Sequence, residues 1–482
     1  VLISPPGCVM LAGAAAGVAA WSGLSARLRP VAVALTAVLA FLAVVPSALP
    51  DPVVDRVKTM APSDPPPDVA FSRWSPVFRV DVLEPPDTFP DSDAFKVLAH
   101  DGMWGSVIRR FDGDLDSLGR YDVDARSVPF AVLAPEPRVM IIGAAGGNEI
   151  LASLHFDAAE ITAVELNPVT VSLLTDHFEA FSGHLDEHPK VELVNAEGRS
   201  FLMQRDDPVD LVWFVAPDSY AAMNAATAGA YVLSESYLYT VEMIEESLRR
   251  LGPGGLLCIQ FGEIDFDRKP NRTARYLASA REALRGLGIE NAGRHVLVAT
   301  QKGFAFTSAT ILVGREPLGD EKVRRFVQGV DSLHRARVRY VPGADDADDR
   351  IATILTADAA GLDRFFDEYP YDVRPVRDDA PFFWHFVSFR AAMATTIKPA
   401  GTGVLEDGLG EQLLVVFLVM AVLLAGVRVV TPLLVQRRRW QQMPHKLLAG
   451  VYFAALGLGF MFFEITPVSS THLTLPTRAS GG

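Results

Sequence analysis

The chain has few cysteines and few clustered positive charges. Its 482 residues include two cysteines, Cys8 in an apolar segment and Cys258 in a predicted strand. Neither a disulfide framework nor a metal site is expected from them. The net charge is −14, and basic residues cluster mainly at 437–439, beside an apolar segment. Nucleic acid is therefore not an expected partner, since phosphate contacts need clustered cations.

A glycine cluster follows a short apolar run at residues 139–142 (VMII). It contains Gly143, Gly146 and Gly147. A second apolar run ends in Glu165, about twenty residues further on. Strand, glycines, helix, strand and acid in this order predict a nucleotide-binding βαβ unit. The glycines would let backbone N–H groups approach a ligand, and Glu165 would bind two ribose hydroxyls.

A third predicted strand, at residues 191–195 (VELVN), indicates the class of ligand, because Glu197 follows it. An acid at this strand end suits recognition of an adenine amino group. The glycine spacing also differs from the G-x-G-x-x-G of dinucleotide sites. Both features favour an S-adenosyl ligand over a nicotinamide cofactor.

Strands and helices alternate between residues 135 and 320. This predicts an α/β, Rossmann-like fold with a parallel sheet and helices on both faces. Ligands of such sheets bind beyond the carboxyl ends of the strands. The residues expected at that edge are Gly143, Glu165, Glu197, Asp218 and Gln260.

The rest of the chain is expected to form several further segments. Short alternating stretches predict a small β-rich subdomain at 69–134, and helical patterns dominate 321–410. The remaining segments are transmembrane helices within 1–50, a linker at 51–68, transmembrane helices within 411–465, and a non-native tail at 466–482.

Membrane insertion is predicted from apolar segments, of which those beginning at Val31 and Leu413 have the length of a bilayer span. The lipid bilayer is therefore an expected partner. Basic loops between the segments favour an extracytoplasmic soluble part. Adenosyl cofactors are made in the cytoplasm, which favours the opposite side, and we expect the soluble part to face the cytoplasm.

Several motifs support a resemblance when they are taken in order. They are 139–147 (VMIIGAAGG), 162–167 (TAVELN), 196–202 (AEGRSFL), 210–218 (DLVWFVAPD), 233–240 (LSESYLYT), 253–260 (PGGLLCIQ), 378–383 (DDAPFF) and 453–461 (FAALGLGFM). Together they resemble the spermidine synthase (polyamine aminopropyltransferase) family, and most closely its membrane-fused bacterial branch.

The resemblance implies a class I S-adenosylmethionine-methyltransferase-type fold. It implies transfer of an aminopropyl group from decarboxylated S-adenosylmethionine to a small-molecule amine. Glu165 would bind the ribose, Glu197 the adenine amino group, and Asp218 the amine. The implied location is a bacterial inner membrane, and a homodimer is left open.

The sequence departs from the family pattern at two acids. The family has an acid that acts as the base where this chain has Val215. It also has an acid that holds the cofactor's terminal amine where this chain has Gly146. Substrate motifs like Tyr-x-Glu near 120–130 and Pro-Thr-Tyr near 297–303 are also missing. Amine attack needs a neutral amine, and a base normally supplies it.

Three functions follow as alternatives. The first is an aminopropyltransferase-like enzyme with an altered site. The second is an S-adenosylmethionine-dependent methyltransferase, favoured by the missing acid at Gly146, because S-adenosylmethionine carries a carboxylate that an acid would repel. The third is a non-catalytic membrane sensor or scaffold.

Overall fold

The computed structural model divides into two compact units. The first comprises residues 1–113, 145–148 and 167–186, and the second comprises 114–144, 149–166 and 187–482. The residues that the structure describes are 5–21, 25–45, 68–75, 78–87, 91–100, 103–214, 235–303, 306–344, 347–394, 408–435, 441 and 444–471.

The first unit contains a four-stranded antiparallel sheet. Its strands follow one another in chain order, as short connections require for antiparallel neighbours. The edge strand is mostly exposed, whereas the second strand is buried along its whole length. The strands are β1 (Val69–Trp74), β2 (Arg79–Leu83), β3 (Phe95–His100) and β4 (Met103–Arg109).

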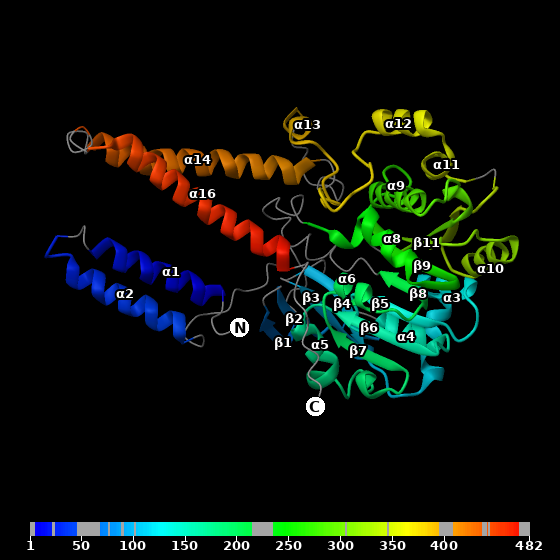
Figure 1. The fold of residues 1–482 in the computed structure, drawn as a ribbon. Helices are drawn as coiled ribbons and strands as arrows, with labels where there is room; N and C mark the ends of the chain where they lie inside the picture. Colours follow the sequence, from blue (N-terminus) through cyan, green and yellow to red (C-terminus); the bar gives the residue numbers. More distant parts are fainter. Residues whose placement is uncertain are drawn as a thin grey trace. The chain divides into compact units, whose positions relative to one another are not determined.

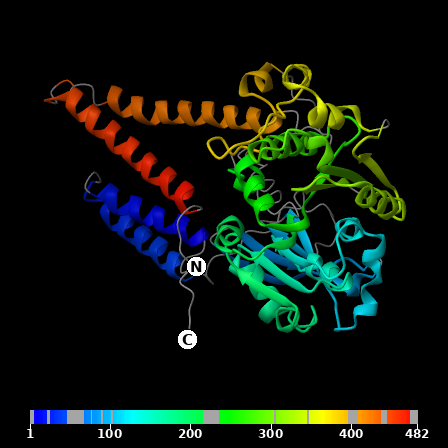
Figure 2. The ribbon, with the colours of Figure 1, turned by 45° about the vertical axis from the view of Figure 1, so that its right-hand side comes forward.

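The helices of the first unit include an apolar pair, α1 (Pro5–Ala20) and α2 (Arg29–Val44). These two lie side by side (Figures 1 and 2). Their backbones approach closely, since a Cβ on Gly17 would lie 2.2 Å from Thr36 Oγ1. The unit also holds α5 (Pro168–Ser172).

The second unit contains an eight-stranded sheet in the order β12-β10-β11-β9-β8-β5-β6-β7. Strands β5 to β9 are mutually parallel, and the order reverses between β5 and β8, where ligands of doubly wound sheets bind. This order, with β11 inserted antiparallel between β9 and β10, is that of methyltransferase-type sheets, and β12 adds an edge strand to it. The parallel strands are β5 (Arg138–Ile142), β6 (Glu160–Glu165), β7 (Val191–Asn195), β8 (Val209–Phe214) and β9 (Leu251–Glu263).

The other end of this sheet contains antiparallel strand pairs, whereas the alternation of strands and helices predicted a parallel sheet. Strand β11 (Thr307–Gly314) pairs antiparallel with both β9 and β10 (Val296–Lys302), because a short connection joins β10 to β11. Strand β12 (Ala336–Tyr340) forms the edge, in a stretch where helices were expected. Its alternation of arginine with apolar residues is that of an edge strand.

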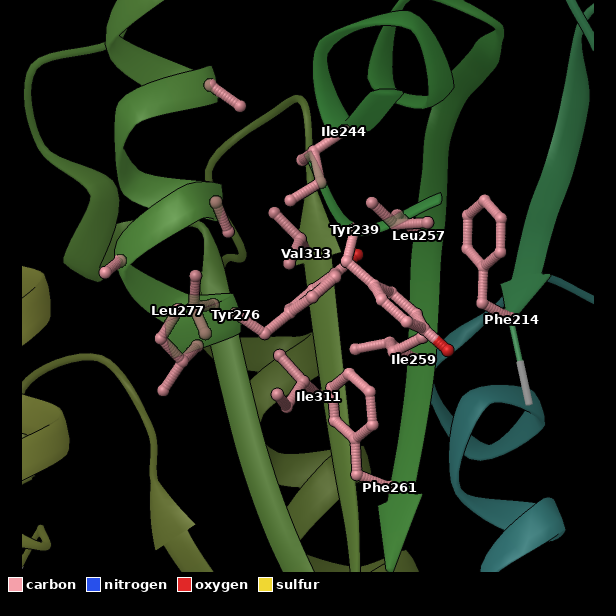
Figure 3. Close-up of a cluster of buried hydrophobic side chains, with 14 of the residues drawn as sticks. Phe214, Tyr239, Ile244, Leu257, Ile259, Phe261, Tyr276, Leu277, Ile311 and Val313 are labelled. Carbon is pink, nitrogen blue, oxygen red and sulfur yellow. The ribbon is translucent and has the colours of Figure 1, made fainter. Parts of the chain in front are cut away.

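Helices cover both faces of the eight-stranded sheet. One face packs on α6, α8 and α9, and Figure 3 shows Phe214, Tyr239, Phe261 and Tyr276 meeting in that core. The other face packs on α3 and α4, where Phe130 contacts Trp213. The helices of this unit are α3 (Val128–Val132), α4 (Asn148–His155), α6 (Gly198–Gln204), α8 (Val241–Arg249), α9 (Asn271–Gly286), α10 (Asp320–Asp331), α11 (Asp349–Thr356), α12 (Ala359–Glu368), α13 (Phe389–Ala394), α14 (Gly410–Val435) and α16 (Lys446–Thr471).

Among the described residues, one helix is long and apolar enough to cross a membrane. It is α14, whose segment Gly410–Arg428 has 19 residues and a mean hydropathy of 2.2. The apolar helices in 7–18, 29–44 and 446–459 are shorter. The span predicted from Val31 is shorter in the structure, because α2 ends at Val44. The next residue, Val45, precedes Pro46, and a residue before proline disfavours the helical conformation. One such helix is weak support for a membrane span, because core helices of soluble proteins share its composition.

Candidate functional site

The first predicted glycine lies directly after β5. Gly143 has a φ of 91°, a conformation that residues with a Cβ rarely adopt. Its N–H donates to Val164 O at 2.9 Å, and the next N–H, of Ala144, donates to the same carbonyl at 3.1 Å. The turn after β5 is therefore tied to the neighbouring strand β6.

Gly146 and Gly147 belong to the first unit. A Cβ on Gly146 would lie 2.0 Å from the backbone oxygen of Val107 in β4. The same oxygen accepts a hydrogen bond from Asn148 Nδ2 at 2.7 Å, which holds the loop against β4. No side chain, and hence no acid, fits at residue 146 in this conformation.

Glu165 is the last residue of β6, and its side chain is largely buried. It pairs with Asn195 at the end of β7. Its backbone oxygen accepts from Ala196 N at 3.1 Å and from Asn195 Nδ2 at 2.9 Å. These bonds place the carboxyl ends of β6 and β7 at one edge of the sheet.

Glu197 is the N-cap of α6. Its carboxylate accepts from Arg199 N at 3.0 Å and from Ser200 N at 2.7 Å. A Cβ on the next residue, Gly198, would lie 2.4 Å from Ile142 Cγ2, so α6 begins directly against the end of β5. The structure thus brings Gly143, Glu165 and Glu197 together at the carboxyl edge of the sheet.

The predicted loop acid, Asp218, and the departure at Val215 lie outside the described residues, directly after β8. The fold does place β8 at the point where the strand order reverses. Asp218 therefore stays a prediction.

A polar network on the other face of the sheet joins the strand ends to the segment before α3. Trp213 Nε1 donates to Gln260 Oε1 at 3.2 Å, and Gln260 Nε2 donates to Ala125 O at 3.1 Å. Gln260 was expected at the edge, but its role as a bridge to Ala125 was not. Residues 135 positions apart carry no sequence signal that they pair.

Next to Ala125, Arg126 lies between two carboxylates. Its Nε is 2.5 Å from Glu149 Oε1, and its Nη1 is 3.1 Å from Asp124 Oδ1. Burial alone would lower the pKa of the arginine, but the charges of Glu149 and Asp124 raise it above its ordinary value. For Asp124, burial would raise the pKa, and Arg126 brings it below its ordinary value. Asp124 and Arg126 are therefore charged at neutral pH, and the contact of Arg126 with Glu149 fixes the beginning of α4.

The carboxylates of Glu165 and Glu197, at the carboxyl edge of the eight-stranded sheet, suit a ligand that donates hydrogen bonds. An ionised carboxylate accepts hydrogen bonds and does not donate them. Glu165 and Glu197 therefore suit the hydroxyls of a ribose and an amino group of a base, and they would repel a phosphate. A nucleoside without phosphates fits this charge pattern best.

No protein-family profile matches the chain. It is similar to a polyamine aminopropyltransferase over part of its length. The relative comes from Streptococcus pneumoniae and is 28% identical over 141 residues, which are 29% of this chain and 45% of the relative. The chain thus matches less than half the length of that curated relative.

The structural similarity between this chain and solved structures is low. A probable spermidine synthase from Corynebacterium glutamicum has a TM-score of 0.40 at 15% identity, covering 60% of this chain and 95% of the other. The spermidine synthase from Thermotoga maritima has a TM-score of 0.37 at 15% identity, covering 61% and 87%. We therefore assign the methyltransferase-type fold class from the strand order of the second unit.

Proposed function

We propose that the carboxyl edge of the eight-stranded sheet binds an S-adenosyl ligand, and that the protein is a transferase acting on a small amine. The observation that carries this proposal is the convergence of Gly143, Glu165 and Glu197 at that edge. Glu165 would take the ribose hydroxyls, and Glu197 would accept from the adenine amino group. The similarity to a polyamine aminopropyltransferase supports the same chemistry.

In this reaction the amine nitrogen attacks the sulfonium-bound carbon of decarboxylated S-adenosylmethionine. A carbon–nitrogen bond forms, the carbon–sulfur bond breaks, and a neutral thioether leaves. The amine must give up a proton, because an ammonium has no free electron pair. Asp218 is our candidate for holding the amine or taking its proton.

Asp218→Asn tests that role, since it keeps the shape of the side chain and removes the charge. We expect the transfer rate to fall by about a hundredfold, the lower end of general-base effects. Asp206→Asn is the control, because Asp206 is an exposed acid preceding β8. Full transfer activity in Asp218→Asn would show that the residue has no catalytic role.

Methyl transfer from S-adenosylmethionine is the second candidate, and Gly146 favours it. The family has an acid at the position of residue 146, which pairs with the terminal amine of the decarboxylated cofactor, and no acid fits there in this conformation. An acid at the same position would repel the carboxylate of S-adenosylmethionine. Titration calorimetry with each cofactor distinguishes the two reactions by the tighter binding. Binding of neither would favour a non-catalytic sensor or scaffold.

We also propose that α14 anchors the protein in a lipid bilayer. The support is the length and mean hydropathy of Gly410–Arg428, whose residues are mostly exposed. The full chain should stay in the membrane fraction after alkaline carbonate washing. Release into the supernatant would contradict an integral span.

A further inference from the structure

An irregular segment, residues 372–386, packs across α8 and α9 after α12. We call it the strap. Arg275 of α9 is buried, and its guanidinium donates to Phe383 O at 2.7 Å and to His385 O at 2.9 Å. The same guanidinium lies 4.5 Å from the ring centre of Phe386. One buried arginine thus fixes the end of the strap on the core of the second unit.

The strap is also bonded to the chain that follows β8. Ser236 N donates to Pro381 O at 2.7 Å, and Val241 N, at the start of α8, donates to Val376 O at 2.8 Å. These contacts lie on either side of Asp378. The position of that residue is therefore set from both directions along the strap.

Asp378 reaches the carboxyl edge of the sheet through Arg199 of α6. The two side chains form a bidentate pair, with Nη1–Oδ1 at 2.7 Å and Nη2–Oδ2 at 2.6 Å. The backbone N–H of the same arginine donates to Glu197. Arg199 thus contacts the strap with its guanidinium and the candidate adenine-binding acid with its backbone.

Helix α6 needs such support because it has seven residues. Helices shorter than about twelve residues are marginal in water, so their position depends on tertiary contacts. A bidentate arginine–carboxylate pair fixes orientation as well as distance. Burial alone would raise the pKa of Asp378, but Arg199 and Thr240 bring it below its ordinary value, so the pair is ionised at neutral pH.

We propose that Asp378 is a positioning residue that holds the first turn of α6, and with it Glu197, in the orientation that binds the adenosyl ligand. The ligand part of this inference rests on the proposed function. The strap thereby makes a segment distant in sequence part of the ligand-binding apparatus.

Asp378→Asn tests the inference, with Asp348→Asn as a matched control. Asp348 also holds an arginine in a bidentate pair, with Arg350 Nη2–Oδ2 at 2.7 Å and Nε–Oδ1 at 3.0 Å, at the start of α11. Both variants lose one charge and one arginine–carboxylate pair. Arg199→Lys is a second variant, because lysine keeps the charge but cannot form the bidentate fork.

The measurements are hydrogen exchange of the peptide covering 198–204 and calorimetric titration of the full chain with both cofactors. We expect Asp378→Asn to accelerate exchange in this peptide and to weaken cofactor binding by about three- to tenfold. Arg199→Lys should do the same to a smaller extent, and Asp348→Asn should change neither.

The two proposals fail in different ways. If the unaltered protein binds neither cofactor, the proposed function is wrong, and the exchange measurement still decides the positioning role. If folded Asp378→Asn shows unchanged exchange at 198–204, the inference is wrong. Equal acceleration in Asp348→Asn would also overturn it, because the effect would then be general destabilisation.

Discussion

At the scale of single residues, Glu197 both caps α6 and is a candidate for binding an amino group of the ligand. Glu197 already caps α6 through both carboxylate oxygens. Each oxygen has a further lone pair, so a ligand amino group can be accepted in addition to the two backbone donors. Glu165 is the last residue of a buried strand and is the candidate for binding the ribose.

Gly146→Ala should be severe, because its Cβ would lie 2.0 Å from a backbone oxygen. Backbone atoms cannot move aside as a flexible side chain can, so the loop or β4 must shift. We expect a loss of about 2 kcal/mol or more in the free energy of unfolding, measured by urea denaturation.

The control for this variant is Gly119→Ala. A Cβ there would have Asp122 Oδ2, at 3.8 Å, as its nearest neighbour. Its unfolding midpoint should stay near that of the unaltered protein. Equal midpoints for the two variants would show that residue 146 is not confined as described.

The sequence predicted acids at strand ends because an apolar run followed by an acid is a local pattern. Glu165 and Glu197 were found in this way, and both lie at the carboxyl edge. The pairing of Arg199 with Asp378 could not be predicted, because 179 residues separate the partners. The cap formed by Glu197 was also missed, because glutamate is not among the residues that usually cap a helix at its N-terminus.

At the scale of elements, the parallel strands could be predicted from their alternation with helices, and β10 and β11 could not. The apolar runs of β10 and β11 are typical of buried strands, whether these are parallel or antiparallel to their neighbours. Direction depends on the length of the connection, and the one between β10 and β11 is too short for a crossover. Strand β12 was missed because its five residues lie between two helices.

His100 at the end of β3 predicts a pH dependence of the stability. Its ring packs 4.2 Å from that of Phe78, and burial lowers its pKa to about 4. The unfolded chain therefore binds a proton near pH 6.5, where the folded protein does not. Stability is fully present above pH 6.5 and falls as the pH drops towards 4, by about 3 kcal/mol in all.

The measurement is the urea-unfolding free energy between pH 4 and pH 7. His100→Gln should flatten the slope in this range. His184→Gln should keep it, because His184 is exposed. An unchanged slope in His100→Gln would mean that other groups cause the pH dependence.

At the scale of the whole molecule, the chain contains a methyltransferase-type sheet, a small antiparallel sheet and an apolar helix of bilayer length. The predicted domain boundaries, the membrane side of the soluble part and a homodimer stay predictions. Composition and patterning indicated the class of each segment. They could not determine function, because it depends on which acids are present at the sheet edge and what they bind.

We propose above that an S-adenosyl ligand binds at the sheet edge, and calorimetric titration of Glu165→Ala measures the contribution of its ribose-binding acid. Two charge-assisted bonds to ribose hydroxyls, each contributing about 1.5–3 kcal/mol, would be lost. Glu160→Ala is the matched control, since Glu160 begins the same strand and is exposed beside Arg138. We expect the unaltered protein and Glu160→Ala to bind a cofactor equally, and Glu165→Ala to bind it at least about tenfold more weakly. Equal binding by a folded Glu165→Ala variant would contradict this expectation.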